Sequence, residues 1–85
     1  MSSLTGSEIR DQLLGYLNDS FPLFIPDAPD DTPMADHGID SLGMTNIVVQ
    51  LEQQFGIEVE DAEITRANLG SVQSLVNFIG KHLSA

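Results

Sequence analysis

Ser41 is the residue best suited to covalent chemistry. It stands in the run DHGIDSLG, residues 36–43, directly before apolar residues of helical spacing. These residue types indicate a loop followed by a helix start, with the hydroxyl exposed at that start. A helix N-terminus presents unpaired N–H groups and partial positive charge, so an anion on this hydroxyl would be stabilised. The chain has no cysteine, which excludes disulfides and any intrinsic thiol chemistry.

Two roles for Ser41 are compatible with the residues alone: catalytic nucleophile and helix cap. A nucleophile needs a base and an oxyanion hole, and the only imidazoles belong to His37 and His82. The G-x-S-x-G pattern is not met, because two residues separate Gly38 from Ser41 and no strand is expected before them. Serine is common as a helix cap. His37 is either a plain loop residue or a contact for a phosphate on Ser41.

Apolar residues at helical spacing predict three main helices. The run TGSE, residues 5–8, is a capping box with Thr5 as N-cap, and a helix is expected over about 6–19. The second helix follows Ser41 and ends before Gly56, a suitable C′ residue. The third begins after Ser71 as N-cap. The expected core stripes are Ile9, Leu13, Tyr16 and Leu17, then Met44, Ile47, Val48, Leu51 and Phe55, and finally Val72, Leu75, Val76, Ile79 and Leu83.

A long loop and a short helix connect these three helices. Residues 20–40 hold all four prolines, and proline fixes φ and removes a donor, so irregular structure is predicted there. The acidic segment Val59–Ile64 is predicted to form one or two turns. The loop side chains expected to tuck into the bundle are Phe21, Leu23, Phe24 and Ile25. The predicted fold class is all-α: a small irregular four-helix bundle with three main helices and one short helix.

The chain is strongly acidic. Its net charge is −10, from thirteen acidic and three basic side chains, and no lysine or arginine lies between Asp11 and Thr65. Such a surface repels nucleic acid and anionic membranes and attracts partners with basic patches. Solubility alone is the plainer explanation of the same charge. Eighty-five residues fit one domain, 1–85, and we expect a monomer with flexible ends at about 1–5 and 84–85.

The remaining sequence features concern the cellular location of the chain and its capacity to bind metal ions. No apolar run reaches the length of about twenty residues that spans a membrane, and the first residues do not resemble a signal peptide. The cytoplasm is therefore the expected location. The acidic clusters lack the spacing and glycine of an EF-hand loop, so no metal site is expected. These clusters are Asp27, Asp30 and Asp31, and Glu58, Glu60 and Asp61.

Two runs carry a family resemblance. GIDSL, residues 38–42, resembles the G-x-D-S-L core of acyl carrier proteins, and LEQQFGIEV, residues 51–59, resembles the run that commonly follows it in that family. Ser71 and Val72 at the start of a last amphipathic helix fit as well. The resemblance implies a non-catalytic carrier whose serine, here Ser41, receives 4′-phosphopantetheine from coenzyme A through a phosphopantetheinyl transferase. The arm would carry acyl or aminoacyl intermediates as thioesters.

Departures from the family pattern bear on the pathway. Gly43, Asn46 and Gln53 stand where carriers of fatty acid synthesis usually have acids, and His37 stands where leucine is common. The runs TPM, residues 32–34, and EITRANL, residues 63–69, look more like discrete carriers of polyketide, nonribosomal-peptide or related specialised pathways. A peptidyl or aminoacyl carrier of a nonribosomal pathway is one alternative. An unmodified acidic helical interaction module is the alternative from another class.

The face of the second helix opposite its core stripe is the expected docking surface. By resemblance, Asp40 and Leu42 help the transferase recognise the junction of loop and helix. The residues expected to meet the loading, condensing or tailoring enzymes of the pathway are Leu42, Thr45, Val49 and Glu52. Apolar side chains rimmed by polar groups can mark partner sites, whereas scattered surface apolarity is the plainer explanation.

Overall fold

The computed structural model describes residues 4–84, and these form helices and turns without a strand. Four α-helices follow one another: α1 (Gly6–Ser20), α2 (Ser41–Phe55), α3 (Arg66–Leu69) and α4 (Val72–Ser84). Two 3-10 helices, η1 (Met34–His37) and η2 (Asp61–Glu63), interrupt the loops. The predicted class, a small all-α bundle, is confirmed.

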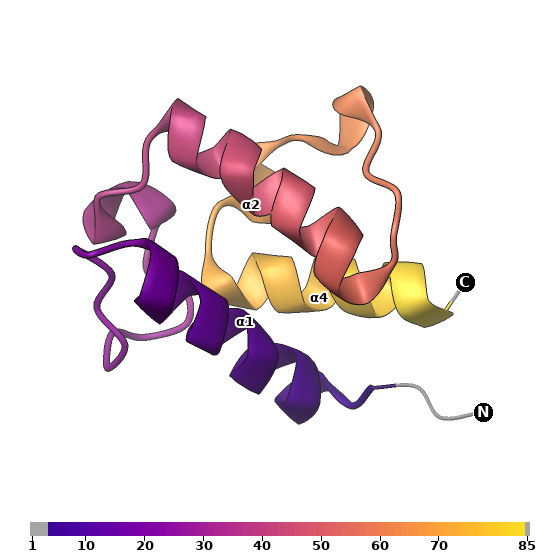
Figure 1. Cartoon of the computed structure of the whole chain (residues 1–85), viewed down its shortest axis with the longest axis horizontal. Helices are drawn as coiled ribbons and strands as arrows, with labels where there is room; N and C mark the ends of the chain where they lie inside the picture. The colour runs from indigo at the N-terminus through magenta and orange to yellow at the C-terminus, as the bar shows by residue number, and fades with distance from the viewer. Residues whose placement is uncertain (1–3, 85) are drawn as a thin grey trace.

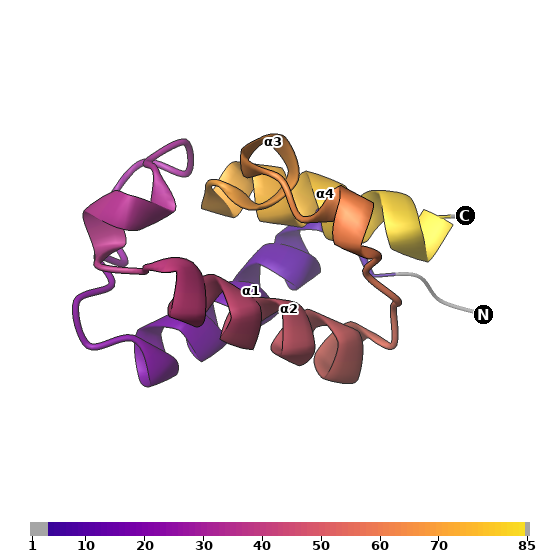
Figure 2. The ribbon, with the colours of Figure 1, turned by 90° about the horizontal axis from the view of Figure 1, so that it is seen from above.

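The three long helices run along the molecule side by side (Figure 1). α1 and α2 point in opposite directions, while α2 and α4 point the same way, as Figure 2 shows from above. The loop before α2 and the start of α2 therefore lie at one end. The start of α1 and the end of α4 lie at the other end, beside the two termini.

Local capping signals fix the helix ends. In α1 the Thr5 hydroxyl accepts the Glu8 N–H at 3.1 Å and the Glu8 carboxylate accepts the Thr5 N–H at 3.0 Å, which confirms the capping box. α2 ends at Gly56, whose φ of 66° is left-handed and suits glycine. The Ser71 hydroxyl accepts the Ser74 N–H at 3.1 Å and begins α4 as predicted. Each cap satisfies donors or carbonyls that the helix leaves unpaired.

The predicted ends of the domain are only partly within the described residues. Thr5 belongs to the capping box of α1, and the Ser84 hydroxyl donates to the Gly80 carbonyl at 2.8 Å. Thr5 is thus the N-cap of α1 and Ser84 is the last residue of α4. Residues 1–3 and 85 lie outside the described residues.

Two short helices lie between α2 and α4, and one of them was predicted. The turn predicted within Val59–Ile64 is present as the 3-10 helix Asp61–Glu63, whereas the α-helical turn Arg66–Leu69 was not predicted. Thr65 begins this α-helical turn, because its hydroxyl accepts the Asn68 N–H at 3.2 Å. Leu69 is buried in the core at the end of the turn.

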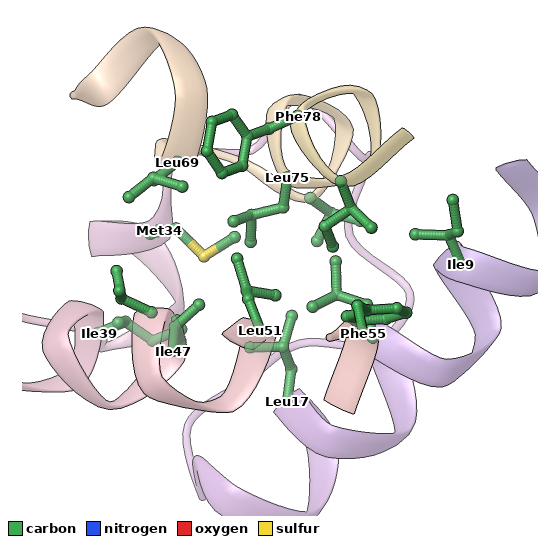
Figure 3. Close-up of a cluster of buried hydrophobic side chains, with 14 of the residues drawn as sticks. Ile9, Leu17, Met34, Ile39, Ile47, Leu51, Phe55, Leu69, Leu75 and Phe78 are labelled. Atoms are coloured by element: carbon green, nitrogen blue, oxygen red, sulfur yellow. The ribbon is translucent and has the colours of Figure 1, made fainter. Parts of the chain in front are cut away.

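One hydrophobic core joins the four α-helices and η1 (Figure 3). Side chains from α1, η1, α2, α3 and α4 point toward one another in it, and α4 lies against both α1 and α3. The predicted stripes are buried except at their edges, where Tyr16, Met44, Val76 and Leu83 are partly buried. The buried apolar residues are Ile9, Leu13, Leu17, Phe24, Met34, Ile39, Ile47, Val48, Leu51, Phe55, Val59, Leu69, Val72, Leu75, Phe78 and Ile79.

The long loop before α2 is anchored to α1, to α4 and to Gly70 between α3 and α4. Asp30 accepts two hydrogen bonds from Arg10 of α1, from Nε at 2.8 Å and from Nη2 at 3.0 Å. The Asp30 carbonyl accepts the Gln73 N–H of α4, and the Met34 N–H donates to the Gly70 carbonyl at 2.9 Å. These contacts fix the second half of the loop, which leads into the start of α2.

The loop was expected to bury four apolar side chains, and that prediction is wrong for two of them. Phe24 is buried and Phe21 is partly buried, but Leu23 is 69% exposed and Ile25 is 48% exposed. His37 occupies the interior instead, at 1% exposure. Its ring stacks on Phe24, with ring centroids 4.4 Å apart. An imidazole therefore fills space that apolar loop residues were expected to fill.

Candidate functional site at the start of α2

A tight turn directs the chain into α2. Gly38 ends η1 with a φ of 74°, a left-handed conformation that glycine adopts without strain. Ile39 then enters the core, and its N–H donates to the Met34 carbonyl at 3.2 Å. Asp40 and Ser41 follow at the surface. The turn and the buried Ile39 thus determine where the first residues of α2 stand.

Asp40, not Ser41, is the N-cap of α2. The Asp40 Oδ1 accepts the Gly43 N–H at 2.9 Å, as N-cap carboxylates do. Ser41 is the first helical residue and is exposed. Within residues 4–84 its hydroxyl takes part in no hydrogen bond, so the capping role once open for Ser41 belongs to its neighbour. The hydroxyl is free to react with a partner.

The surroundings of Ser41 suit an attached anion. α2 has fifteen residues and no acidic residue in its first turn. Ser41 therefore lies at the positive end of the helix dipole, where the first N–H groups lack intrahelical partners, and the Asp40 carboxylate offsets part of that charge. A phosphodiester on Ser41 would be favoured by the same field. The residues present thus fit a phosphate-linked group.

The histidines are not placed to serve Ser41 as a base. His37 Nδ1 accepts the Ile25 N–H at 3.1 Å, and its Nε2 is buried without a partner among the described residues. The suggested contact between His37 and a phosphate on Ser41 is therefore wrong, and so is its description as a plain loop residue. His82 lies in the last turn of α4, where its Nε2 is 3.2 Å from the Glu63 carboxylate. Ser41 has no imidazole with which to form a catalytic pair.

The outer face of α2 carries most of the predicted contact residues. Leu42 is 71% exposed and Val49 is 46% exposed, with exposed Thr45 and Asn46 between them. The Thr45 hydroxyl donates to the Ser41 carbonyl at 3.1 Å, as a side chain one turn later on the helix can. Leu42, Thr45 and Val49 are therefore accessible on the side of α2 away from the core. We call these three residues the α2 outer face.

Glu52 has a different position. Its side chain is half-buried, and its carboxylate accepts the Val59 N–H at 3.0 Å. The carboxylate thus ties the loop after α2 to the helix. Its capacity for partner contact is correspondingly smaller than that of the α2 outer face.

Two packing contacts lie close to the junction of loop and helix. Leu23 packs over Gly38, since a Cβ built on Gly38 would lie 2.7 Å from Leu23 Cδ1. Gly43 is buried against Phe21 and Ile39. Both contacts join the loop to the start of α2 and depend on tertiary structure, so residue spacing alone could not reveal them.

Within residues 4–84, no three His, Asp or Glu side chains gather closely enough to hold a metal ion. None of the helices in that range has the length and apolar character needed to cross a membrane.

Comparisons with known proteins give the family. A sequence profile described as the phosphopantetheine attachment site matches residues 11–79, a range that includes Ser41. An acyl carrier protein of Campylobacter hominis is 35% identical over 74 residues, covering 85% of each chain. The mitochondrial acyl carrier protein 2 of Arabidopsis thaliana is 34% identical over 99% of this chain and 66% of its own length. No solved structure gives a significant match.

Other relatives match a shorter stretch. An acyl carrier protein of Rickettsia bellii is 39% identical over 49 residues, 58% of this chain, and the chain spans only 58% of that relative's length. These relatives are carriers by name rather than enzymes, and the prosthetic group that the matched family implies is a covalent 4′-phosphopantetheine. The chain belongs to the phosphopantetheine-binding acyl carrier protein family.

Proposed function

We propose that the chain carries acyl or aminoacyl intermediates as thioesters on a 4′-phosphopantetheine arm attached to Ser41. One observation carries the proposal most strongly: Asp40 takes the cap of α2 and leaves the exposed Ser41 hydroxyl without a partner in the described part of the chain. The family match covers the same position. When bound, the arm supplies the thiol that the chain lacks.

The chemistry of attachment fits a residue with no base of its own. A bond forms between Ser41 Oγ and the phosphorus next to pantetheine in coenzyme A. The bond from that phosphorus to the bridging oxygen breaks, and adenosine 3′,5′-bisphosphate leaves. The hydroxyl proton passes to a base of the phosphopantetheinyl transferase, because neither His37 nor His82 is available to Ser41. The helix N-terminus favours the phosphodiester that results.

The α2 outer face is the proposed docking surface for the transferase and for the pathway enzymes. Its exposed apolar side chains, Leu42 and Val49, lie on the helix that begins at Ser41. The acids in the surrounding sequence have no basic counterpart, because no lysine or arginine lies between Asp11 and Thr65. An enzyme surface with basic groups around an apolar centre would complement it.

Polyketide, nonribosomal-peptide or related specialised metabolism is the pathway class we propose. The support is the sequence of residues 32–34 and 63–69, and the loss of acids at Gly43, Asn46 and Gln53. The relatives named above are general acyl carrier proteins and do not distinguish the pathway. The cytoplasmic location and the monomeric state stay predictions from the sequence.

Intact mass spectrometry tests the proposal. The purified chain is incubated with coenzyme A, Mg²⁺ and a broad-specificity phosphopantetheinyl transferase, beside Ser41→Ala and a control variant, Ser7→Ala. Ser7 is an exposed serine in the first turn of α1. We expect one phosphopantetheine on the wild type and on Ser7→Ala, and none on Ser41→Ala. A folded wild type that gains no mass would favour the unmodified interaction module instead.

A further inference from the structure

Gly43 stands out because it is a buried glycine within the first turn of α2. Glycine is among the least favourable residues for a helix interior. The space that a side chain would need is already occupied: a Cβ at position 43 would lie 2.9 Å from Ile39 Cγ2 and 3.1 Å from Phe21 Cε1. The glycines inside the other long helices differ, since a Cβ on Gly15 or Gly80 would have no neighbour within 4 Å.

Phe21 and Ile39 reach Gly43 from two directions. Phe21 follows α1, and its ring packs edge-on against Tyr16 with the centroids 6.0 Å apart. Ile39 is buried and stands two residues before Ser41. The end of α1 and the turn before α2 therefore meet on the backbone of residue 43, where only a glycine leaves room.

The same glycine takes part in the cap. Its N–H donates to Asp40 Oδ1 at 2.9 Å, and a Cβ would lie 3.5 Å from that oxygen. Ile39 Cγ2 is attached directly to the Cβ of Ile39, so it cannot retreat without a new rotamer or a backbone shift. A shift of the Ile39 backbone would displace Asp40 and Ser41, which follow it directly.

We propose that Gly43 is a positioning residue for the modification of Ser41, and that it acts through the packing of Phe21 and Ile39 against its backbone. The absent side chain lets both pack against the first turn and fixes where the Ser41 hydroxyl stands relative to the α2 outer face. This inference rests on the proposed attachment at Ser41. Gly43 acts through the backbone and contacts neither coenzyme A nor the arm.

Steady-state kinetics of the transferase with the apo chain as substrate test the inference. In Gly43→Ala the hydroxyl is misplaced while Val49, two turns further on, is undisturbed. We expect kcat to fall about ten-fold or more, as small misplacements of reacting groups do, with KM changed by less than roughly two-fold. Gly15→Ala is the matched control, and both of its constants should equal those of the wild type.

A second substitution separates positioning from a general loss of structure. Leucine keeps the volume of isoleucine but has no branch at Cβ, so Ile39→Leu removes the shorter contact. We expect Gly43→Ala combined with Ile39→Leu to recover most of the lost kcat. If Gly43→Ala does not fold, Phe21→Leu is the variant to measure. It removes the ring from Gly43 without adding a clash, and kcat should fall several-fold.

The outcomes are distinct. A wild type that gains no phosphopantetheine contradicts the proposed function itself. A wild type that is modified, with Gly43→Ala or Phe21→Leu showing the same kcat and KM, overturns the positioning role alone. A folded Gly43→Ala whose kcat falls and is not recovered by Ile39→Leu also overturns it, because the packing contact would then not be the cause.

Discussion

Two neighbouring residues at the start of α2 have separate roles, one as the helix cap and one as the exposed hydroxyl. Asp40 provides the capping oxygen, and Ser41, one position later, keeps its hydroxyl unpaired within residues 4–84. The division matters because a capping hydroxyl would have to leave its N–H partner before reacting. At Ser41 no such bond must be broken.

Replacement of Asp40 tests this division. Asp40→Ala removes the acceptor of the Gly43 N–H and should lower the free energy of unfolding by about 1 kcal/mol, the usual value of a cap. Asp40→Asn keeps a capping oxygen and should lower the free energy of unfolding by only roughly a few tenths of a kcal/mol. Urea unfolding followed by far-UV circular dichroism measures both. Equal stability of Asp40→Ala and the wild type would show that the cap contributes nothing.

His37 shows where reasoning from residue types fails. A lone histidine between aspartate and glycine gives no sign of burial, yet its ring stacks on Phe24 and accepts the Ile25 N–H. Leu23 and Ile25 show the converse, since they are apolar but exposed. The loop has no periodicity from which to choose an inward face, and its contacts with distant residues decide the outcome.

At the scale of the elements, α2 has two faces with different tasks. The core face holds Ile47, Val48, Leu51 and Phe55, all buried, and the α2 outer face holds exposed residues. This separation was predictable, because the 3.6-residue period alone assigns each position to a side of the helix. The ends of α1, α2 and α4 were predictable as well, since capping motifs are local. The short α3 was not, because four residues carry no helical periodicity and the burial of Leu69 depends on tertiary contacts.

Aspartate substitutions on the two faces of α2 should behave differently. Val49→Asp places a charge in solvent and should change the free energy of unfolding by less than about 0.5 kcal/mol. It should keep modification by the transferase and lower turnover by a pathway enzyme that docks on this face. Leu51→Asp buries a charge in the core and should prevent folding. Circular dichroism measures whether each variant folds and how stable it is, and intact mass measures its modification by the transferase. If Val49→Asp unfolds the chain, the assignment of this face is wrong.

At the scale of the whole molecule, a few long-range contacts hold the loop that precedes Ser41. Asp30 is central among them, because it joins Arg10 of α1 by its side chain and Gln73 of α4 by its carbonyl. The hydrogen bond and the charge of Arg10 lower the pKa of the Asp30 carboxyl below its ordinary value, and desolvation acts against them more weakly than that hydrogen bond. In a chain of net charge −10, the arginine of α1 that pairs with this loop offsets local repulsion between acids.

The Arg10–Asp30 pair should make stability depend on pH. A lowered pKa in the folded state means that the carboxylate adds stability above its unfolded pKa, about 4. That contribution is lost as the pH falls through the lowered pKa. The melting temperature of the wild type should therefore exceed that of Asp30→Asn at pH 7, and the difference should shrink toward zero below roughly pH 4. Asp31→Asn, at the neighbouring exposed acid, is the control. A difference that stays constant with pH would contradict the role of the pair.

The most direct measurement locates the added group. The chain treated with coenzyme A and transferase is digested, and the modified peptide is sequenced by tandem mass spectrometry. The expected result is a single phosphopantetheine on Ser41, with every other serine and threonine unmodified. A group found on another residue, or a fully folded chain that carries none, would contradict the proposed role of Ser41 as the attachment point.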